Sequence, residues 1–250
     1  MNWWEESYGF FDRDYLDNFE PLVDEESTKM QVEFIIKALE IPPGSKILDL
    51  AGGMGRHSIE LALKGFQCVL LDINTAFLNK ARELAKQKDV NIEIINRDMR
   101  EIDYCESFDG VISMSTSFGY FSNDEDHFRV INSVFKSLRR GGKFLLDLDN
   151  RERIIKFFKK YEWFKVKDTF VLRNAELDLY ENRIKENIVR ICLDKRNVKE
   201  HFITIRMFTL NEIKTMVERG GFNIIQVFGN YDFSNYNMES YRMILLSQKS

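Results

Sequence analysis

The chain has 250 residues, of which 44% are hydrophobic and 30% charged, and its formal net charge is −4 at pH 7. This length accommodates one large domain, or one domain with an insert, around a full core. The slightly acidic balance argues against a general nucleic-acid surface, and no apolar run approaches the roughly 20 residues that a membrane span requires.

The start of the sequence and its cysteines favour a cytoplasmic chain. Met1 to Glu6 contain neither a basic nor an apolar stretch, so we do not expect a secretory signal. The three cysteines are scattered and lack C-x-x-C spacing, and the three histidines form no cluster in sequence. We therefore expect neither a disulfide framework nor a metal site.

Residues 3–26 are rich in aromatic and acidic side chains and precede the first predicted strand. Such a density of rings favours either a cover folded over a site or a helix packed on the outside of the domain. A helix is expected from Glu26 to Leu39, with Ser27 as its cap, because apolar residues recur at helical spacing before Pro42-Pro43-Gly44. Residues 1–40 are assigned to this cover and helix.

Apolar runs then alternate with segments of helical spacing, which predicts a doubly wound α/β domain. Asn74 is expected to cap one helix, and Ser122 to Glu125 resemble a capping box for another. The expected strands are 46–50, 67–72, 92–97, 108–113 and 143–148, and the expected helices are 55–64, 75–88, 124–139 and 151–160.

From Tyr161 to Phe208 the pattern changes to alternating apolar and polar residues, which predicts antiparallel strands with one covered face. The runs at 170–173, 177–180, 184–193 and 201–206 are the expected strands of this inserted sheet. A helix at 209–221 and strands at 222–231 and 240–248 follow. The main domain is therefore assigned to 41–155 and 206–250, and the insert to 156–205.

The stretch from Lys46 to Ser58 predicts a buried strand, a tight glycine turn and a helix, an arrangement that holds a nucleotide-like ligand. Gly52, Gly53 and Gly55 allow close approach of a ligand to the backbone. A dinucleotide fingerprint would have a third glycine where Ser58 stands, so the match to that pattern is partial.

Motifs in chain order resemble the class I S-adenosylmethionine-dependent methyltransferases. The first is Asp49-Leu-Ala-Gly-Gly-Met-Gly55, in which Ala51 replaces a glycine, a change that costs little if its φ is negative. Asp72 ends the next strand, Asp98-Met99 follows the third, and Phe108-Asp-Gly-Val opens the fourth, which leads to Met114.

The resemblance implies a Rossmann-like, seven-stranded sheet with an antiparallel last strand, and S-adenosylmethionine as cofactor. It implies that the glycine turn holds the methionyl part of the cofactor, that Asp72 holds the ribose, and that Asp98 and Met99 hold the adenine. In the family a tyrosine at about the position of Tyr15 covers the cofactor. The expected cofactor contacts are Tyr15, Asp49, Ala51, Gly52, Gly53, Gly55, Arg56, Asp72, Ile73, Asp98, Met99 and Met114.

A methyl group bonded to a positively charged sulfur needs no nucleophile from the protein, only orientation and exclusion of water. A base is needed where the substrate arrives protonated, and Tyr15, Tyr120 and His127 are the candidates. We expect N- or O-methylation of a small molecule, because residues 113–118 lack the motifs of DNA methyltransferases. The alternatives are a cofactor-binding accessory protein, an NAD oxidoreductase, and an RNA or protein methyltransferase; an oligomer is not indicated.

Overall fold

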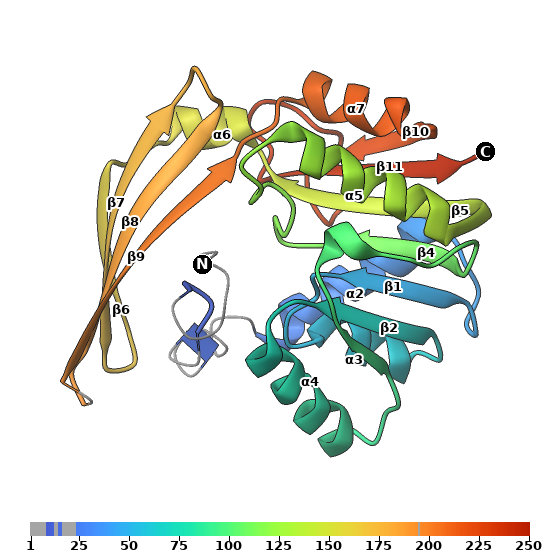
Figure 1. The fold of residues 1–250 in the computed structure, drawn as a ribbon, viewed down its shortest axis with the longest axis horizontal. Coiled ribbons are helices and arrows are strands. Elements are labelled where there is room, and N and C mark those ends of the chain that lie inside the picture. The colour runs from blue at the N-terminus through green and yellow to red at the C-terminus, as the bar shows by residue number, and fades with distance from the viewer. Residues whose placement is uncertain (1–8, 13–14, 17–23, 195) are drawn as a thin grey trace.

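The structure is a computed structural model that describes residues 9–12, 15–16, 24–194 and 196–250. Within these residues the chain forms a large unit around a seven-stranded sheet and a separate four-stranded antiparallel sheet (Figure 1). The predicted fold class, a doubly wound α/β sheet with an antiparallel last strand and an inserted antiparallel sheet, is confirmed.

The large sheet has the strand order β10-β11-β5-β4-β1-β2-β3. β1 pairs in parallel with β2 on one side and with β4 on the other, so the winding direction reverses at β1. Ligands of such sheets bind beyond the carboxyl ends of the strands at this reversal. The strands are β1 Lys46–Leu50, β2 Gln67–Asp72, β3 Glu93–Asn96, β4 Phe108–Ser113, β5 Leu138–Asp149, β10 Phe222–Phe228 and β11 Arg242–Lys249.

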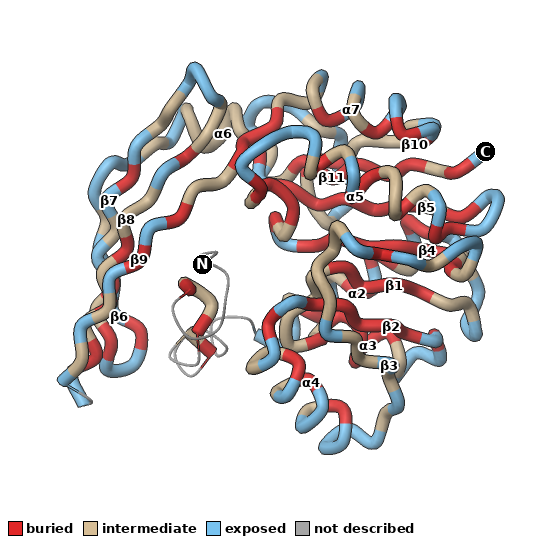
Figure 2. The backbone as a smooth tube through the Cα atoms, viewed as in Figure 1, coloured by how far each residue is buried: buried red, intermediate tan, exposed pale blue. Residues whose placement is uncertain are grey.

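Helices cover both faces of the large sheet. Val130 and Val217 bring α5 and α7 into the apolar cluster on one face, while Val32 and Leu61 bring α2 and α3 into the cluster on the other. The central strands are therefore buried on both sides (Figure 2), which explains their continuous apolar sequence. The helices are α2 Glu25–Leu39, α3 Arg56–Leu63, α4 Thr75–Gln87, α5 Asp124–Ser137, α6 Arg151–Lys156 and α7 Leu210–Arg219.

Two predicted helix caps are wrong, because a neighbouring side chain has the better position. Asp24 accepts the backbone N–H of Ser27 at 2.5 Å, so Asp24 rather than Ser27 caps α2. Asn123 accepts the backbone N–H of Asp126 at 2.8 Å and caps α5, in place of the expected capping box from Ser122. The predicted cap of α4, Asn74, is confirmed.

Two predicted ends also differ from the structure. α5 stops at Ser137 and β5 begins at Leu138, which pairs with Phe108 of β4, so residues 138–142 belong to the strand rather than to the helix end. α6 ends at Lys156 instead of continuing to residue 160. At the first of these ends the strand buries Leu138, an apolar side chain that the helical pattern also fitted.

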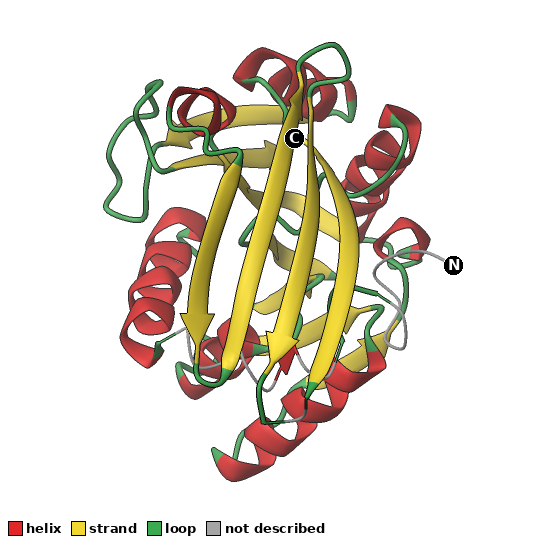
Figure 3. Cartoon of the chain, turned by 90° about the vertical axis from the view of Figure 1, so that its left-hand side faces the viewer, coloured by secondary structure: helices red, strands yellow, loops and turns green. Residues whose placement is uncertain are grey.

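The four-stranded sheet consists of β6 Tyr161–Val166, β7 Thr169–Asp178, β8 Arg183–Cys192 and β9 Asn197–Arg206. The predicted strands at 170–173 and 177–180 are one strand, since β7 pairs with β8 without a break, and β6 was not predicted. The inner face packs Val171, Ile188 and Ile203 around Phe10. The broad outer face, turned to the viewer in Figure 3, carries the exposed Trp163.

Candidate active site

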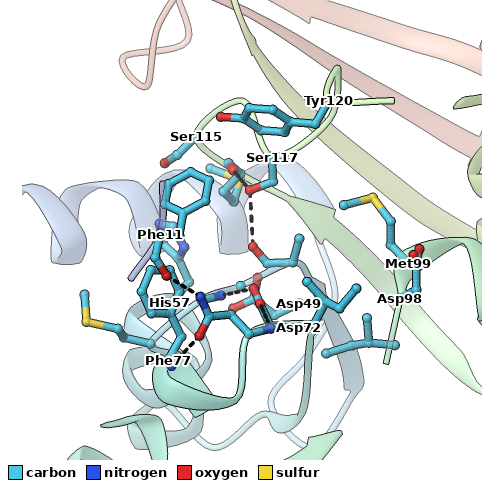
Figure 4. A pocket seen from close by; sticks show the side chains of 18 of the residues that line it. Phe11, Asp49, His57, Asp72, Phe77, Asp98, Met99, Ser115, Ser117 and Tyr120 are labelled. Carbon is cyan, nitrogen blue, oxygen red and sulfur yellow. Dashed lines mark hydrogen bonds between the residues drawn. The ribbon is translucent and has the colours of Figure 1, made fainter. Parts of the chain in front are cut away.

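A cavity of about 280 Å³ lies beyond the carboxyl ends of β1, β2 and β4, where the winding of the sheet reverses (Figure 4). The loops after these strands form its walls, together with residues from the N-terminal segment. The lining residues are Phe11, Tyr15, Asp49, Ala51, Gly52, Gly53, Met54, Arg56, His57, Leu71, Asp72, Ile73, Asn74, Phe77, Arg97, Asp98, Met99, Met114, Ser115, Ser117, Tyr120 and Phe121.

The turn between β1 and α3 brings backbone to the cavity wall. A Cβ at Gly52 would lie 2.5 Å from Cγ of Asp49, so no larger residue fits there without a shift. Ala51 has φ 54°, in the left-handed region, so the condition of a negative φ under which alanine would cost little there is not met. Gly55 lies outside the lining; a Cβ there would lie 2.9 Å from Leu70, so it allows α3 to approach β2.

Asp49 is buried in the wall of the cavity with one oxygen unused. Oδ2 accepts a hydrogen bond from Ser58 Oγ at 2.7 Å, whereas Oδ1 has no hydrogen-bond partner among the described residues. Burial raises the pKa of Asp49 to about 6, although Ser58 and Arg56 act to lower it. A buried acceptor without a partner needs an explanation, and in a cavity wall a ligand that donates to it is the simplest one.

Asp72, at the end of β2, joins two loops of the site. Its Oδ2 accepts the N–H of Gly53 and its Oδ1 that of Asn74, each at 2.8 Å. Burial raises the pKa of this carboxyl group, and these backbone hydrogen bonds oppose the rise. Ile73, the next residue, is 39% exposed and lines the cavity. The carboxylate is therefore fixed in place by the same turn that carries the glycines.

Asp98 and Met99 lie two and three residues beyond the end of β3, which stops at Asn96, one residue earlier than predicted. Asp98 caps the short 3₁₀ helix η2 (Met99–Glu101) by accepting the N–H of Arg100 at 2.8 Å. Burial acts to raise the pKa of Asp98, but the hydrogen bonds from Arg100 outweigh it and hold the pKa below its usual value. Both Asp98 and Met99 line the cavity, as Figure 4 shows.

The loop after β4 is strained and is held from behind. Ser115 and Thr116 have φ of 57° and 60°, a conformation that costs about 1–3 kcal/mol for such residues. The fully buried Asp147 accepts the N–H of Ser115 at 2.8 Å, and Asp147 in turn accepts hydrogen bonds from Arg242 and Tyr231, both at 2.7 Å. These contacts keep Met114 and Ser115 at the cavity wall.

Two neighbouring residues at the start of α3 connect this loop to α2. Arg56 donates to Gln31 Oε1 at 2.6 Å and to Ser115 Oγ at 3.0 Å. His57 places Nε2 at 2.8 Å from the same Gln31 oxygen, and burial lowers its pKa well below the usual value. His57 was not predicted as a site residue; its position in the first helical turn after the glycines was the available signal.

Aromatic rings from the N-terminal segment, from α4 and from the loop after β4 line the cavity. The ring centroid of Phe11 lies 5.0 Å from that of Tyr15, 5.9 Å from that of Phe77 and 6.2 Å from that of Tyr120. Burial raises the pKa of both tyrosines, so both are neutral hydroxyls at physiological pH. Of the predicted cover, residues 1–8, 13–14 and 17–23 lie outside the described part of the chain; Phe11 and Tyr15 lie over the cavity.

His127 does not reach the cavity, although it was a candidate base. Its side chain is fully buried between the rings of Phe118, Phe121 and Phe208, and its Nδ1 lies 2.9 Å from the carbonyl oxygen of Asn123. Burial lowers the pKa of His127 to about 4. It therefore stays uncharged in the core of the domain, and we remove it from the candidate bases.

Within residues 9–12, 15–16, 24–194 and 196–250, no three His, Cys, Asp or Glu side chains gather closely enough to hold a metal ion. In the same part of the chain, no helix combines the length and the apolar character needed to cross a membrane.

Comparison with known proteins agrees with this geometry. Residues 47–142 match the family model described as a methyltransferase domain. A glycine/sarcosine N-methyltransferase of Aphanothece halophytica is 25% identical over 201 residues, which cover 80% of this chain and 74% of the relative.

Solved structures share the fold over nearly the whole chain. An S-adenosylmethionine-dependent methyltransferase from Clostridium acetobutylicum superposes with a TM-score of 0.81 at 17% identity, covering 95% of this chain and 96% of the other. CalS10 of Micromonospora echinaspora, an amino pentose methyltransferase with S-adenosylmethionine bound, superposes with a TM-score of 0.68 at 17% identity, covering 97% and 99%. Residues 47–142 are thus a methyltransferase domain, and nearly the whole chain shares the fold of S-adenosylmethionine-dependent methyltransferases.

Proposed function

We propose that the cavity is the S-adenosylmethionine site and that the enzyme methylates the nitrogen of a small, amine-bearing molecule. The observation that carries the proposal is the composition of the cavity, whose lining combines strand-end carboxylates with neutral aromatic rings. S-adenosylmethionine supplies a methyl group bonded to a positively charged sulfur, and aromatic faces attract such a cation.

The unpartnered Oδ1 of Asp49 fits the protonated amino group of the methionyl part, which would donate to it beside the backbone of Ala51, Gly52 and Gly53. Asp72 is proposed to accept hydrogen bonds from the ribose hydroxyls, as carboxylates at this position of α/β sheets do. Asp98 and Met99 would contact the adenine. Tyr15, Arg56, Ile73 and Met114 complete the proposed cofactor contacts, while Gly55 contributes only through helix packing.

The chain's own acid–base groups favour an amine over an alcohol as the methyl acceptor. Tyr15 and Tyr120 are poor bases because burial raises the pKa of each, and His57 is a weak base because burial lowers its pKa. An amine loses its proton to water near pH 8 to 10 and then reacts without help, whereas a hydroxyl needs a base in place. Tyr120 is proposed to orient the amine through its hydroxyl rather than to deprotonate it.

The comparisons support the same substrate class at low identity. The relative from Aphanothece halophytica is named for N-methylation of glycine and sarcosine, and CalS10 is described as an amino pentose methyltransferase. Both names describe small molecules that carry an amine. The aromatic mouth of the cavity in this chain would accept a compact molecule of that kind.

The test is to incubate purified protein with S-adenosylmethionine and matched pairs of small amines and the corresponding alcohols, measuring S-adenosylhomocysteine. We expect formation with amines only, at a rate that rises with pH through the pKa of the amine in use. Tyr120→Phe should lower the rate while leaving this pH profile in place. Turnover of the alcohols but not the amines, or a profile that shifts in Tyr120→Phe, would refute the amine assignment.

A further inference from the structure

Three consecutive residues of the N-terminal segment are held alternately by the two units of the fold. Arg190 of β8 donates to the carbonyl oxygen of Phe10 at 2.9 Å and to Oδ1 of Asp12 at 3.0 Å. From the opposite side, Nδ2 of Asn74 donates to the carbonyl oxygen of Phe11 at 2.5 Å. The segment therefore joins the four-stranded sheet to the large unit, in the space between them in Figure 1.

Asp12 is the charged centre of this junction. Its side chain is buried; besides Arg190, it accepts Lys199 Nζ at 2.7 Å through Oδ2 and the backbone N–H of Tyr15 at 2.9 Å through Oδ1. Arg190 is only 3% exposed, and its remaining hydrogen bond places Nη2 at 2.5 Å from Nε2 of His201. Charges this deeply buried persist only when paired, so each partner depends on the other.

The junction leads directly to the cavity. Phe11 and Tyr15, on either side of Asp12 in sequence, both line it. Asn74 donates its side-chain N–H to the carbonyl oxygen of Phe11 and its backbone N–H to Asp72. The proposed ribose carboxylate is therefore linked through Asn74 to the N-terminal segment, which Arg190 joins to the four-stranded sheet.

We propose that Asp12 is a positioning residue for methyl transfer. Asp12, Arg190 and Lys199 form a clasp that holds Phe11 and Tyr15 closed over the cofactor. None of the three clasp residues is among those that line the cavity, so the clasp acts through the two rings. The inference rests on the cavity being the cofactor site, but it is independent of which substrate is methylated.

The variant Asp12→Asn removes the charge of the side chain but keeps an oxygen that can accept the backbone N–H of Tyr15. The carboxylate charge that pairs with Arg190 and Lys199 is thereby lost. Opening of the segment becomes favourable. When the closed fraction falls to about a tenth, the apparent dissociation constant of a ligand that needs closure rises about tenfold.

The experiment measures binding of S-adenosylhomocysteine by calorimetry and amide hydrogen exchange of residues 9–16 by mass spectrometry. Asp12→Asn should bind about tenfold more weakly and exchange faster in this segment. Asp178→Asn is the matched control, because Asp178 also accepts a backbone N–H, that of Glu181, at 2.9 Å and a lysine, Lys185, at 2.7 Å, but lies outside the cavity lining. It should change neither measurement.

A double-mutant cycle and a milder variant test the mechanism further. Arg190→Gln combined with Asp12→Asn should weaken binding no more than the stronger single variant, because both remove one interaction. If Asp12→Asn does not fold, Lys199→Gln replaces it and should weaken binding in the same direction by a smaller factor.

Wild-type affinity in Asp12→Asn, or weaker binding without faster exchange of residues 9–16, would overturn the clasp. Failure of the wild-type protein itself to bind S-adenosylhomocysteine would instead overturn the assignment of the cavity. Turnover experiments with amines bear on neither outcome, so a wrong substrate class and a wrong clasp are distinguishable.

Discussion

Replacing Asp72 by asparagine tests the cofactor assignment most directly. Asp72→Asn keeps the shape of the side chain but turns one acceptor oxygen into an NH₂ donor. In the structure both carboxylate oxygens accept backbone N–H groups, one from Gly53 and one from Asn74. The amide can satisfy only one of them, and its NH₂ then faces the other donor.

The size of the effect follows from these contacts. A buried N–H left without an acceptor costs about 1–3 kcal/mol, so the free energy of unfolding should fall by about that amount. Loss of a charged acceptor for the ribose hydroxyls removes about 1.5–3 kcal/mol from binding, which corresponds to a roughly 10- to 150-fold weaker affinity. The domain should remain folded, because its apolar clusters are untouched.

The assay is calorimetric titration of S-adenosylhomocysteine into the wild-type protein, Asp72→Asn and the control Asp89→Asn, with urea unfolding of each. Asp89 is exposed and lies outside the cavity lining, so its replacement should alter neither quantity. If Asp72→Asn binds with wild-type affinity, Asp72 does not hold the ribose. The proposed assignment of the other cofactor contacts to successive strand ends would then also be refuted.

Burial holds the pKa of Asp49 at about 6, and an ammonium group of the ligand would lower that pKa. Below pH 6, binding of S-adenosylhomocysteine should therefore release protons, and its affinity should increase as the pH rises. Binding heats that do not depend on the ionisation enthalpy of the buffer would contradict this prediction. The pKa of His127, about 4 when folded, lies below the unfolded 6.5, so its share of stability is lost as pH falls between these values. His127→Phe should flatten that part of the urea-unfolding profile and leave turnover within a few-fold, whereas a base would cost roughly 100-fold or more. Ala51→Gly relieves about 1–2 kcal/mol of left-handed strain at the cost of about 0.5–1 kcal/mol of backbone entropy, so the free energy of unfolding should rise by up to about 1.5 kcal/mol. A fall in the free energy of unfolding would contradict the strain.

Much of the fold follows from local pattern. The apolar strands β1 and β2, which carry Asp49 and Asp72 near their carboxyl ends, are buried on both faces, and this burial is what makes them recognisable in sequence. Asn74 was predicted as a cap because capping depends on a side chain and the backbone two or three residues on. Features of this kind are set within a few residues, so a single sequence contains them.

The remaining features depend on contacts between distant residues. Nothing near Phe11 in sequence indicates that it meets Tyr120, and nothing near Arg190 indicates that it meets Asp12. The position of His127 in the first turns of a helix is compatible with an exposed or a catalytic residue, yet tertiary packing buries its side chain among aromatic rings. Local propensity and periodicity say little about such pairs, since the whole fold decides which surfaces meet.

The support behind the loop after β4 has a consequence for biosynthesis. The strands that carry the methyltransferase motifs, β1 to β4, are complete once residue 113 has been translated. The side chains that hold Asp147 in place behind the loop, however, are those of Tyr231 and Arg242, close to the end of the chain. A nascent chain emerges from the ribosome from its N-terminus. Such a chain can assemble the glycine turn early and still lack a properly shaped site until its final hairpin has been translated.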